Sequence, residues 1–186
     1  MNIKRLGILL SASLFLFLYS CKEHQEKAKL CINEVLIDNV DNYQDDYGVH
    51  SAWIEIFNNS FGSVDIASYR IWVKTEGIGE TTYVIPKGDV HTIIKPRQHV
   101  LFWADGEPSK GTFHTNIKLY NDRTMWIEIH DSGGKMVGEG LKLVPNTIKA
   151  NQSFGRVEDG APVWEVKDGS QNRYVTPSTN NRANVG

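Results

Sequence analysis

The sequence has little cysteine, little excess charge and almost no helical patterning. Its 186 residues include only two cysteines, Cys21 and Cys31, so a disulfide framework is excluded and a packed core must supply stability. The formal net charge is −2, whereas a general polyanion binder is normally basic. Apolar residues do not recur at helical spacing over a dozen positions outside the N-terminal segment. These shortages favour a strand-rich, mildly acidic domain.

Sequence motifs of common enzymes and metal sites are also missing. The chain has no Gly-x-Ser-x-Gly elbow, no phosphate-binding glycine loop and no Cys-x-x-Cys pair. Its histidines do not show the i, i+4 spacing of a helical zinc site. We therefore expect no catalytic residues, no metal ligands and no cofactor, and hence a protein that is not an enzyme.

The N-terminal segment has the pattern of an export signal. Lys4 and Arg5 precede Leu6–Tyr19, which is apolar apart from two serines and falls short of the ~20 residues of a spanning helix. The end of this segment, Leu18-Tyr19-Ser20-Cys21, resembles the lipobox of bacterial lipoproteins, although Tyr19 stands where a small residue is commoner. The resemblance implies a signal peptide at residues 1–20 and a diacylglycerol on Cys21. Two or three acyl chains hold a protein firmly on a membrane, which the mature chain would not span.

The mature chain is expected to be one domain on a tether in the bacterial cell envelope, at the outer membrane or the cell surface. Loss of Lys4 and Arg5 takes the formal charge from −2 to −4. Residues 21–29 form the polar tether, 30–177 the domain and 178–186 a polar tail. Cys31 begins an apolar segment and is expected to be a small buried residue; an intermolecular disulfide or a reactive thiol are the alternatives.

Short segments rich in β-branched and aromatic residues, separated by turn formers, predict an all-β fold, a β-sandwich. In Met125–His130 and in Trp53–Phe57 the isoleucines alternate with other residues, so one face of each strand should be buried. Asp131-Ser132-Gly133-Gly134 predicts a hairpin turn. The predicted strands are Leu30–Ile37, Ala52–Asn58, Ser68–Lys74, Thr81–Ile85, His99–Trp103, Met125–His130, Lys135–Gly140 and Ser153–Val157.

Several motifs in order resemble the lamin tail domain. They are Ile32-Asn33-Glu34-Val35, Trp53–Asn58, Val64–Tyr69, Tyr83–Gly88, Ile94–Arg97, His114–Leu119, Ile127–Asp131, Ser153–Arg156, Trp164 and Thr176-Pro177. The resemblance implies an immunoglobulin-like β-sandwich that serves in attachment or binding. Bacterial members often stand beside enzyme domains, whereas only a polar end is expected after the sandwich here. The expected function is a non-catalytic, lipid-anchored binding or scaffolding module with a protein or envelope-polymer partner.

An acidic loop is the best candidate binding site. Residues 38–48 are rich in the carboxylate and amide oxygens from which Ca²⁺ takes about 6–8 ligands, but the spacing is not that of an EF-hand. The same loop suits a partner interface, through Tyr43 and Tyr47, or a plain solvated loop. Trp126 lies opposite the isoleucine face and is a candidate for stacking on a sugar. The candidate ligand-binding residues are Asp38, Asp41, Asp45, Asp46 and Trp126.

Two alternatives remain open. Glu34 and Glu55 could form the carboxylate pair of a minor hydrolase, which needs both in a cleft; otherwise they are polar strand residues, with Arg156 as a candidate partner. A nucleic-acid- or glycan-binding module serving an exported hydrolase is the other alternative. Nucleic-acid binding is a weaker expectation, because it would need one shared basic face on the sandwich. The residues for such a face are Lys87, Lys95, Arg97, Lys118 and Arg123.

Overall fold

The computed structural model describes residues 30–169 and 173–181. The expected signal peptide, Cys21, the tether and the last five residues of the expected tail lie outside this range. Within it, no helix is both long and apolar enough to cross a membrane. The strands are β1 Leu30–Leu36, β2 Trp53–Asn58, β3 Val64–Asp65, β4 Arg70–Thr75, β5 Gly79–Val84, β6 Ile93–Ile94, β7 His99–Trp103, β8 Met125–His130, β9 Leu141–Leu143, β10 Ser153–Arg156 and β11 Trp164–Lys167, with 3-10 turns η2 Val90–Thr92 and η3 Pro108–Lys110.

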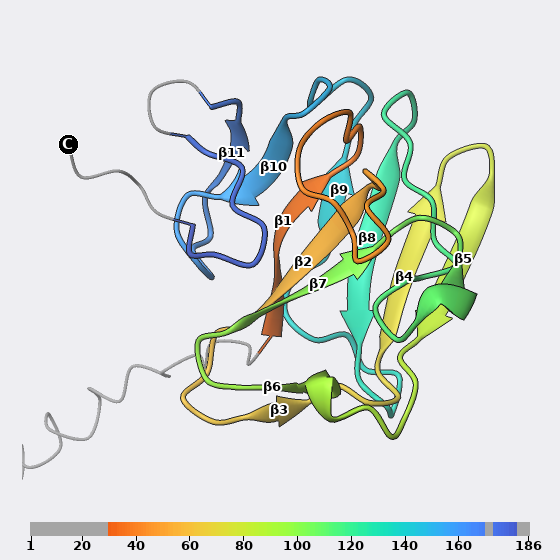
Figure 1. Ribbon diagram of the computed structural model, residues 1–186, viewed down its shortest axis with the longest axis vertical. Helices are drawn as coiled ribbons and strands as arrows, with labels where there is room; N and C mark the ends of the chain where they lie inside the picture. The colour runs from red at the N-terminus through yellow and green to blue at the C-terminus, as the bar shows by residue number, and fades with distance from the viewer. Residues whose placement is uncertain (1–29, 170–172, 182–186) are drawn as a thin grey trace, which may run out of the picture.

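Two antiparallel sheets form a sandwich, as the sequence predicts (Figure 1). One has the order β11-β10-β1-β2-β7 and the other β5-β4-β8-β9, while β3 and β6 form a small separate ladder. The core between the sheets includes Ile54 and Ile56 of β2 and Ile127 and Ile129 of β8. A bulge in β1 between Ile32 and Glu34 lets both Ile32 and Val35 face this core. The immunoglobulin-like all-β prediction is thus confirmed.

The alternation predicted for the isoleucine-containing strands is confirmed in β8 and wrong in β2. In β8 the isoleucines are buried, while Trp126, Glu128 and His130 are half-exposed. Every residue of β2 is buried, because β2 lies between β1 and β7 and its outer face is covered too. Residues 173–181, here called the covering segment, supply much of that cover: Val175 packs against a second apolar cluster that contains Trp53. Buried polar residues on the outer face therefore have protein rather than water as their surroundings.

Other boundaries differ from prediction for identifiable reasons. The turn at Asp131–Gly134 forms, since the Asp131 and Gly134 amides donate to Lys135 and Asp131 carbonyls. The strand expected at Lys135–Gly140 is wrong, since Met136 makes only a single bridge to His130. Gly138 has φ +73°, and the Leu30 carbonyl lies so close to it that a side chain would not fit. Pairing with β8 resumes only at β9. The short strands β3, β6 and β9 and the terminal β11 were not predicted. The domain also extends past residue 177, because Asn181 is buried.

Candidate functional site

The two glutamates form a closed polar cluster beneath the covering segment. Glu34 and Glu55 are cross-strand neighbours in β1 and β2, and each is 0% exposed. Glu34 accepts hydrogen bonds from Ser153 and from the Thr176 amide and hydroxyl. Glu55 accepts from Asn33 Nδ2 at 2.9 Å and from the Ser178 amide at 2.7 Å. We call this group the covered carboxylates; every side-chain oxygen in it has a partner.

Burial dominates the ionisation of these two residues. It raises the pKa of Glu34 above its ordinary value, against the opposing hydrogen bonds from Ser153 and Thr176. It raises the pKa of Glu55 well above its ordinary value, and the neighbouring Glu34 charge adds to the rise. Both carboxylates are fully buried, whereas a hydrolase needs its carboxylates open to a cleft, so the geometry contradicts the hydrolase alternative. The covered carboxylates are structural.

Arg156 is not the partner of either glutamate, which corrects that expectation. Its Nε donates to the Ile32 carbonyl at 2.8 Å and its Nη1 donates to the Ala161 carbonyl. The guanidinium also lies 4.6 Å from the centre of the Trp164 ring. The charged side chain thus contacts β1 and the chain that leads to β11, and its Nη2 lies 3.8 Å from Glu139 Oε2.

Cys31 is a small core residue, as expected. It is buried and makes no disulfide, and burial raises the pKa of its thiol to about 11. Because the thiolate is the nucleophile, a thiol that keeps its proton in a buried setting is inert. Burial therefore argues against both alternatives, a reactive thiol and an intermolecular disulfide.

The acidic loop between β1 and β2 folds back on the sandwich. The Asp38 carbonyl accepts from the Asn151 amide, and the Asp41 amide donates to Asn151 Oδ1. The Tyr43 ring stacks on Trp103, with centroids 5.9 Å apart, and the Tyr47 hydroxyl donates to the Lys110 carbonyl. Asp46 is exposed, while Asp45 is buried at 6% exposure. The four aspartates thus do not converge, and only Asp45 turns inward.

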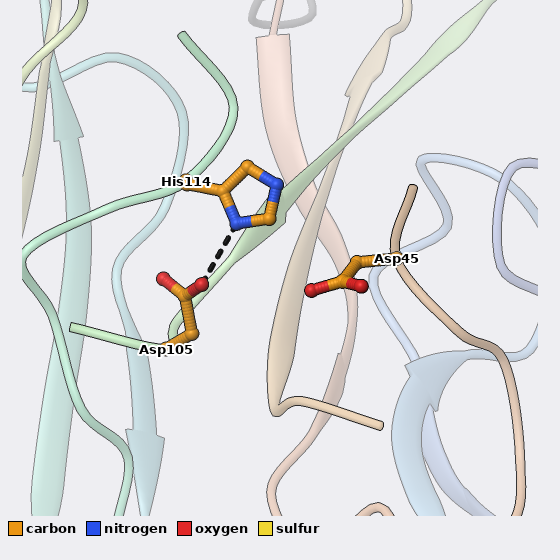
Figure 2. Close-up of side chains that lie close together, drawn as sticks. All are labelled: Asp45, Asp105 and His114. Atoms are coloured by element: carbon orange, nitrogen blue, oxygen red, sulfur yellow. Dashed lines mark hydrogen bonds and ion pairs between the residues drawn. The ribbon is translucent and has the colours of Figure 1, made fainter. Parts of the chain in front are cut away.

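Asp45 meets two residues from the connection after β7. One candidate ligand atom from each of Asp45, Asp105 and His114 lies within 4.8 Å of the other two, and Figure 2 shows the Asp45 carboxylate directed toward the other side chains. His114 Nδ1 lies 2.7 Å from Asp105 Oδ2. We call these three residues the loop cluster. They combine two carboxylates and an imidazole, a donor set that can hold a divalent cation.

One basic side chain borders the loop cluster. Lys110 Nζ lies 3.4 Å from Asp105 Oδ2 and 3.1 Å from Glu107 Oε2. Burial acts to raise the pKa of Asp105, but hydrogen bonds from His114 and from the Glu107 amide outweigh it and hold the pKa below its ordinary value. Both side-chain oxygens of Asp105 therefore have hydrogen-bond partners, and the nearby Lys110 ammonium offsets its charge.

A groove of about 700 Å³ runs beside the loop cluster. Most of its lining comes from the acidic loop, from the stretch that contains η2 and β6, and from β7; Phe113 and Ser178 complete it. Aromatic rings of Tyr43, Trp103 and Phe113 alternate there with polar groups. Asp46 is the one candidate ligand-binding residue of the acidic loop that lines it. This mixture of apolar and polar lining is typical of a recognition surface.

Trp126 does not join this surface. It lies on β8, in the other sheet, with Lys142 Nζ 5.3 Å from its ring centre, and it is not part of the groove lining. The basic residues are also dispersed. Arg97 lies over Phe57, Lys118 packs beside Gly106, and Lys95 lines the groove. Composition pointed to Asp45 but to neither Asp105 nor His114, because these two residues lie far from the acidic loop in the sequence.

Comparison with protein families gives one match, the Lamin Tail Domain, over residues 23–140. That range ends before β9, so β10, β11 and the covering segment lie beyond it. No curated protein matches the chain. Because the match spans more than half of the sequence and agrees with the observed sandwich, the chain belongs to the lamin tail domain family, whose members are non-enzymatic, immunoglobulin-like binding or scaffolding domains.

Proposed function

We propose that this protein is a lipid-anchored, non-catalytic binding module of the bacterial cell envelope. In this proposal, Cys21 carries the acyl chains, residues 22–29 hold the domain off the membrane, and the groove beside β7 takes an extended segment of a protein partner. The observation that carries the partner assignment is the free edge of β7.

The backbone of β7 has one paired side and one largely open side. Gln98 O accepts from Asn58 and Ala104 N donates to Ala52, so the even-numbered residues face β2. Backbone groups alternate along a strand, and those of His99, Leu101 and Trp103 therefore point away from β2. Trp103 already bonds on that side to Phe113 and Thr115. Among the described residues no strand pairs with β7 there.

An extended peptide fits this edge better than a sugar or a nucleic acid. It would supply the backbone donors and acceptors that His99 and Leu101 lack on their outer side, as in β-strand addition. The segment 113–115 already runs beside Trp103 in parallel register, and the groove continues from there along β7. Tyr43 and Ile93 both line the groove and would contact the side chains of the added strand.

Photo-crosslinking in intact cells tests the partner assignment. A photoreactive residue at Ile93, in the groove and 50% exposed, is compared with one at Ile78, outside it and 53% exposed. We expect capture of a protein from position 93 only, and binding of a peptide from that protein to the purified full-length chain. Leu101→Pro removes an outward N–H while leaving the pairing with β2, so it should weaken peptide binding at least several-fold. Equal capture at both positions, or none, would contradict the proposal.

The anchor has a separate test. The N-terminal peptide of the protein, purified from a bacterial membrane fraction, is analysed by mass spectrometry. We expect it to begin at Cys21 with a thioether-linked diacylglycerol and an acylated amine. A peptide that begins elsewhere, or an unmodified Cys21, would refute the lipid anchor. It would not affect the proposal that the groove binds a peptide.

A further inference from the structure

We propose that Asp45, Asp105 and His114 bind a divalent transition-metal ion of the Zn²⁺ class, which fastens the acidic loop to the connection after β7. This site does not depend on the anchor or on the proposed partner. Its starting point is a single unsatisfied atom on Asp45.

Asp45 is a buried carboxylate with only one oxygen in use. Its Oδ1 accepts from the Tyr47 and Val49 amides at 2.9 and 2.8 Å, which shapes the turn. Its Oδ2 is buried and has no hydrogen-bond partner in the described structure. A buried acceptor without a partner is costly, and more so when it is charged. Figure 2 shows this carboxylate directed toward His114 and Asp105, where a cation would satisfy it.

The donor set selects the kind of cation. Two carboxylates and one imidazole suit Zn²⁺ or a neighbouring first-row ion, whereas Ca²⁺ prefers oxygen alone. The candidate ligand atoms lie within 4.8 Å of one another, so small side-chain rotations bring them to a common ion. His114 Nδ1 faces Asp105; in the Nε2–H tautomer it offers a lone pair to an ion that also binds Asp105. Water would complete the coordination.

The local charge balance agrees with a bound cation. Lys110 compensates Asp105, but it also contacts Glu107 at 3.1 Å and can remain there when an ion arrives. No ion pair to Asp45 is found among the described residues. The competing account is that these three side chains pack together without a metal. That account predicts no binding of added zinc at this place.

Metal binding would have a structural consequence for the groove. Asp45 belongs to the loop that places Tyr43, Gln44 and Asp46 along the groove wall. Asp105 and His114 belong to the connection between β7 and β8. An ion held by both segments cross-links parts of the chain that are distant in sequence, so it fixes the position of that wall.

Calorimetric titration of the metal-stripped full-length chain with ZnCl₂ tests the inference. We expect a site of one ion per chain in the wild type, at least tenfold weaker in Asp45→Asn and in His114→Gln, and unchanged in Asp46→Asn. The last variant removes the same charge from the same loop at an exposed position. If His114→Gln fails to fold, Asp45→Asn still tests the site, because asparagine retains the Oδ1 acceptor that shapes the turn. A hundredfold excess of zinc over Kd should raise the wild-type Tm by about 5–10 °C.

Two results would overturn the site. One is a wild-type protein that binds no zinc, or binds CaCl₂ in its place. The other is an Asp45→Asn variant that binds zinc as the wild type does, since the ion would then lie elsewhere. Neither result affects the capture experiment at Ile93 or the mass of the N-terminal peptide.

Discussion

The covered carboxylates and the two aspartates of the loop cluster are both pairs of acids whose side chains are little exposed, but only the first pair has a hydrogen-bond partner for every oxygen. All four oxygens of Glu34 and Glu55 accept hydrogen bonds. In the loop cluster, by contrast, Asp45 Oδ2 has no hydrogen-bond partner in the described structure. Burial of acidic groups is therefore a weak indicator of a functional site. The unsatisfied atom is what distinguishes a place that awaits a ligand from a place that is already complete.

The largest expected effect comes from breaking the complete cluster. Asn33 is fully buried, donates to Glu55 and Asp159, and accepts from the Gly160 amide. Asn33→Ala would leave two buried carboxylates short of a donor, so we expect the free energy of unfolding to fall by about 2–4 kcal/mol. Urea denaturation measures this change.

Asn116→Ala is the matched control for that variant. Asn116 is exposed and donates one hydrogen bond, to the Thr82 carbonyl. Its loss should change stability by less than about 1 kcal/mol. If the two variants lose the same stability, the covered carboxylates do not depend on their donors in the way that the contacts imply.

The difference between the covered carboxylates and the loop cluster also explains which features of the fold could be predicted from the sequence. Alternating isoleucines identified β8, and turn residues identified the turn after it, because both signals are local. Glu55 between two isoleucines has the same pattern as an exposed residue, and parts of the chain distant in sequence, the covering segment among them, make it buried. Local periodicity cannot distinguish these cases.

The candidate site was predictable in part for the same reason. Composition pointed to the acidic loop and hence to Asp45. Its partners Asp105 and His114 follow β7, so strands β2 to β7 separate them from Asp45 in the chain. No spacing rule joins residues so far apart. The loop's other aspartates, and Trp126, were equally reasonable candidates on composition. Tertiary contacts, which composition does not contain, decided among them.

A second effect is a pH dependence of stability that belongs to the covered carboxylates. Folding raises the pKa of Glu34 and Glu55 above 4.5. A raised carboxyl pKa means tighter proton binding in the folded state, so the stabilising contribution is complete below about 4.5 and is lost as pH rises through the folded value. Asp105 and Asp159, whose pKa values are lowered, act in the opposite direction but only near and below 3.8.

Glu55→Gln should reduce that loss, because the amide cannot ionise. The measurement is the difference in unfolding free energy between pH 4.5 and pH 7.5, which we expect to be smaller in the variant than in the wild type. Glu158→Gln, at an exposed position, should leave the difference unchanged. A wild-type slope that persists in Glu55→Gln would show that some other group titrates in this window.

The smallest expected effect concerns the loop cluster and refines its charge balance. Lys110 lies over the Tyr47 ring and shares its charge between Asp105 and Glu107. Lys110→Met keeps an apolar side chain of similar length beside Tyr47 but removes the ammonium that competes with an added cation. Because a partly exposed ion pair contributes about 0.2–1 kcal/mol, zinc affinity should rise by a factor of about 1.4 to 5. Lys142→Met, which removes a lysine charge from β9 in the other sheet, is the control and should leave zinc affinity unchanged. Weaker zinc binding in Lys110→Met would mean that the lysine positions Asp105 for the ion, and the loop cluster would then be a four-residue arrangement.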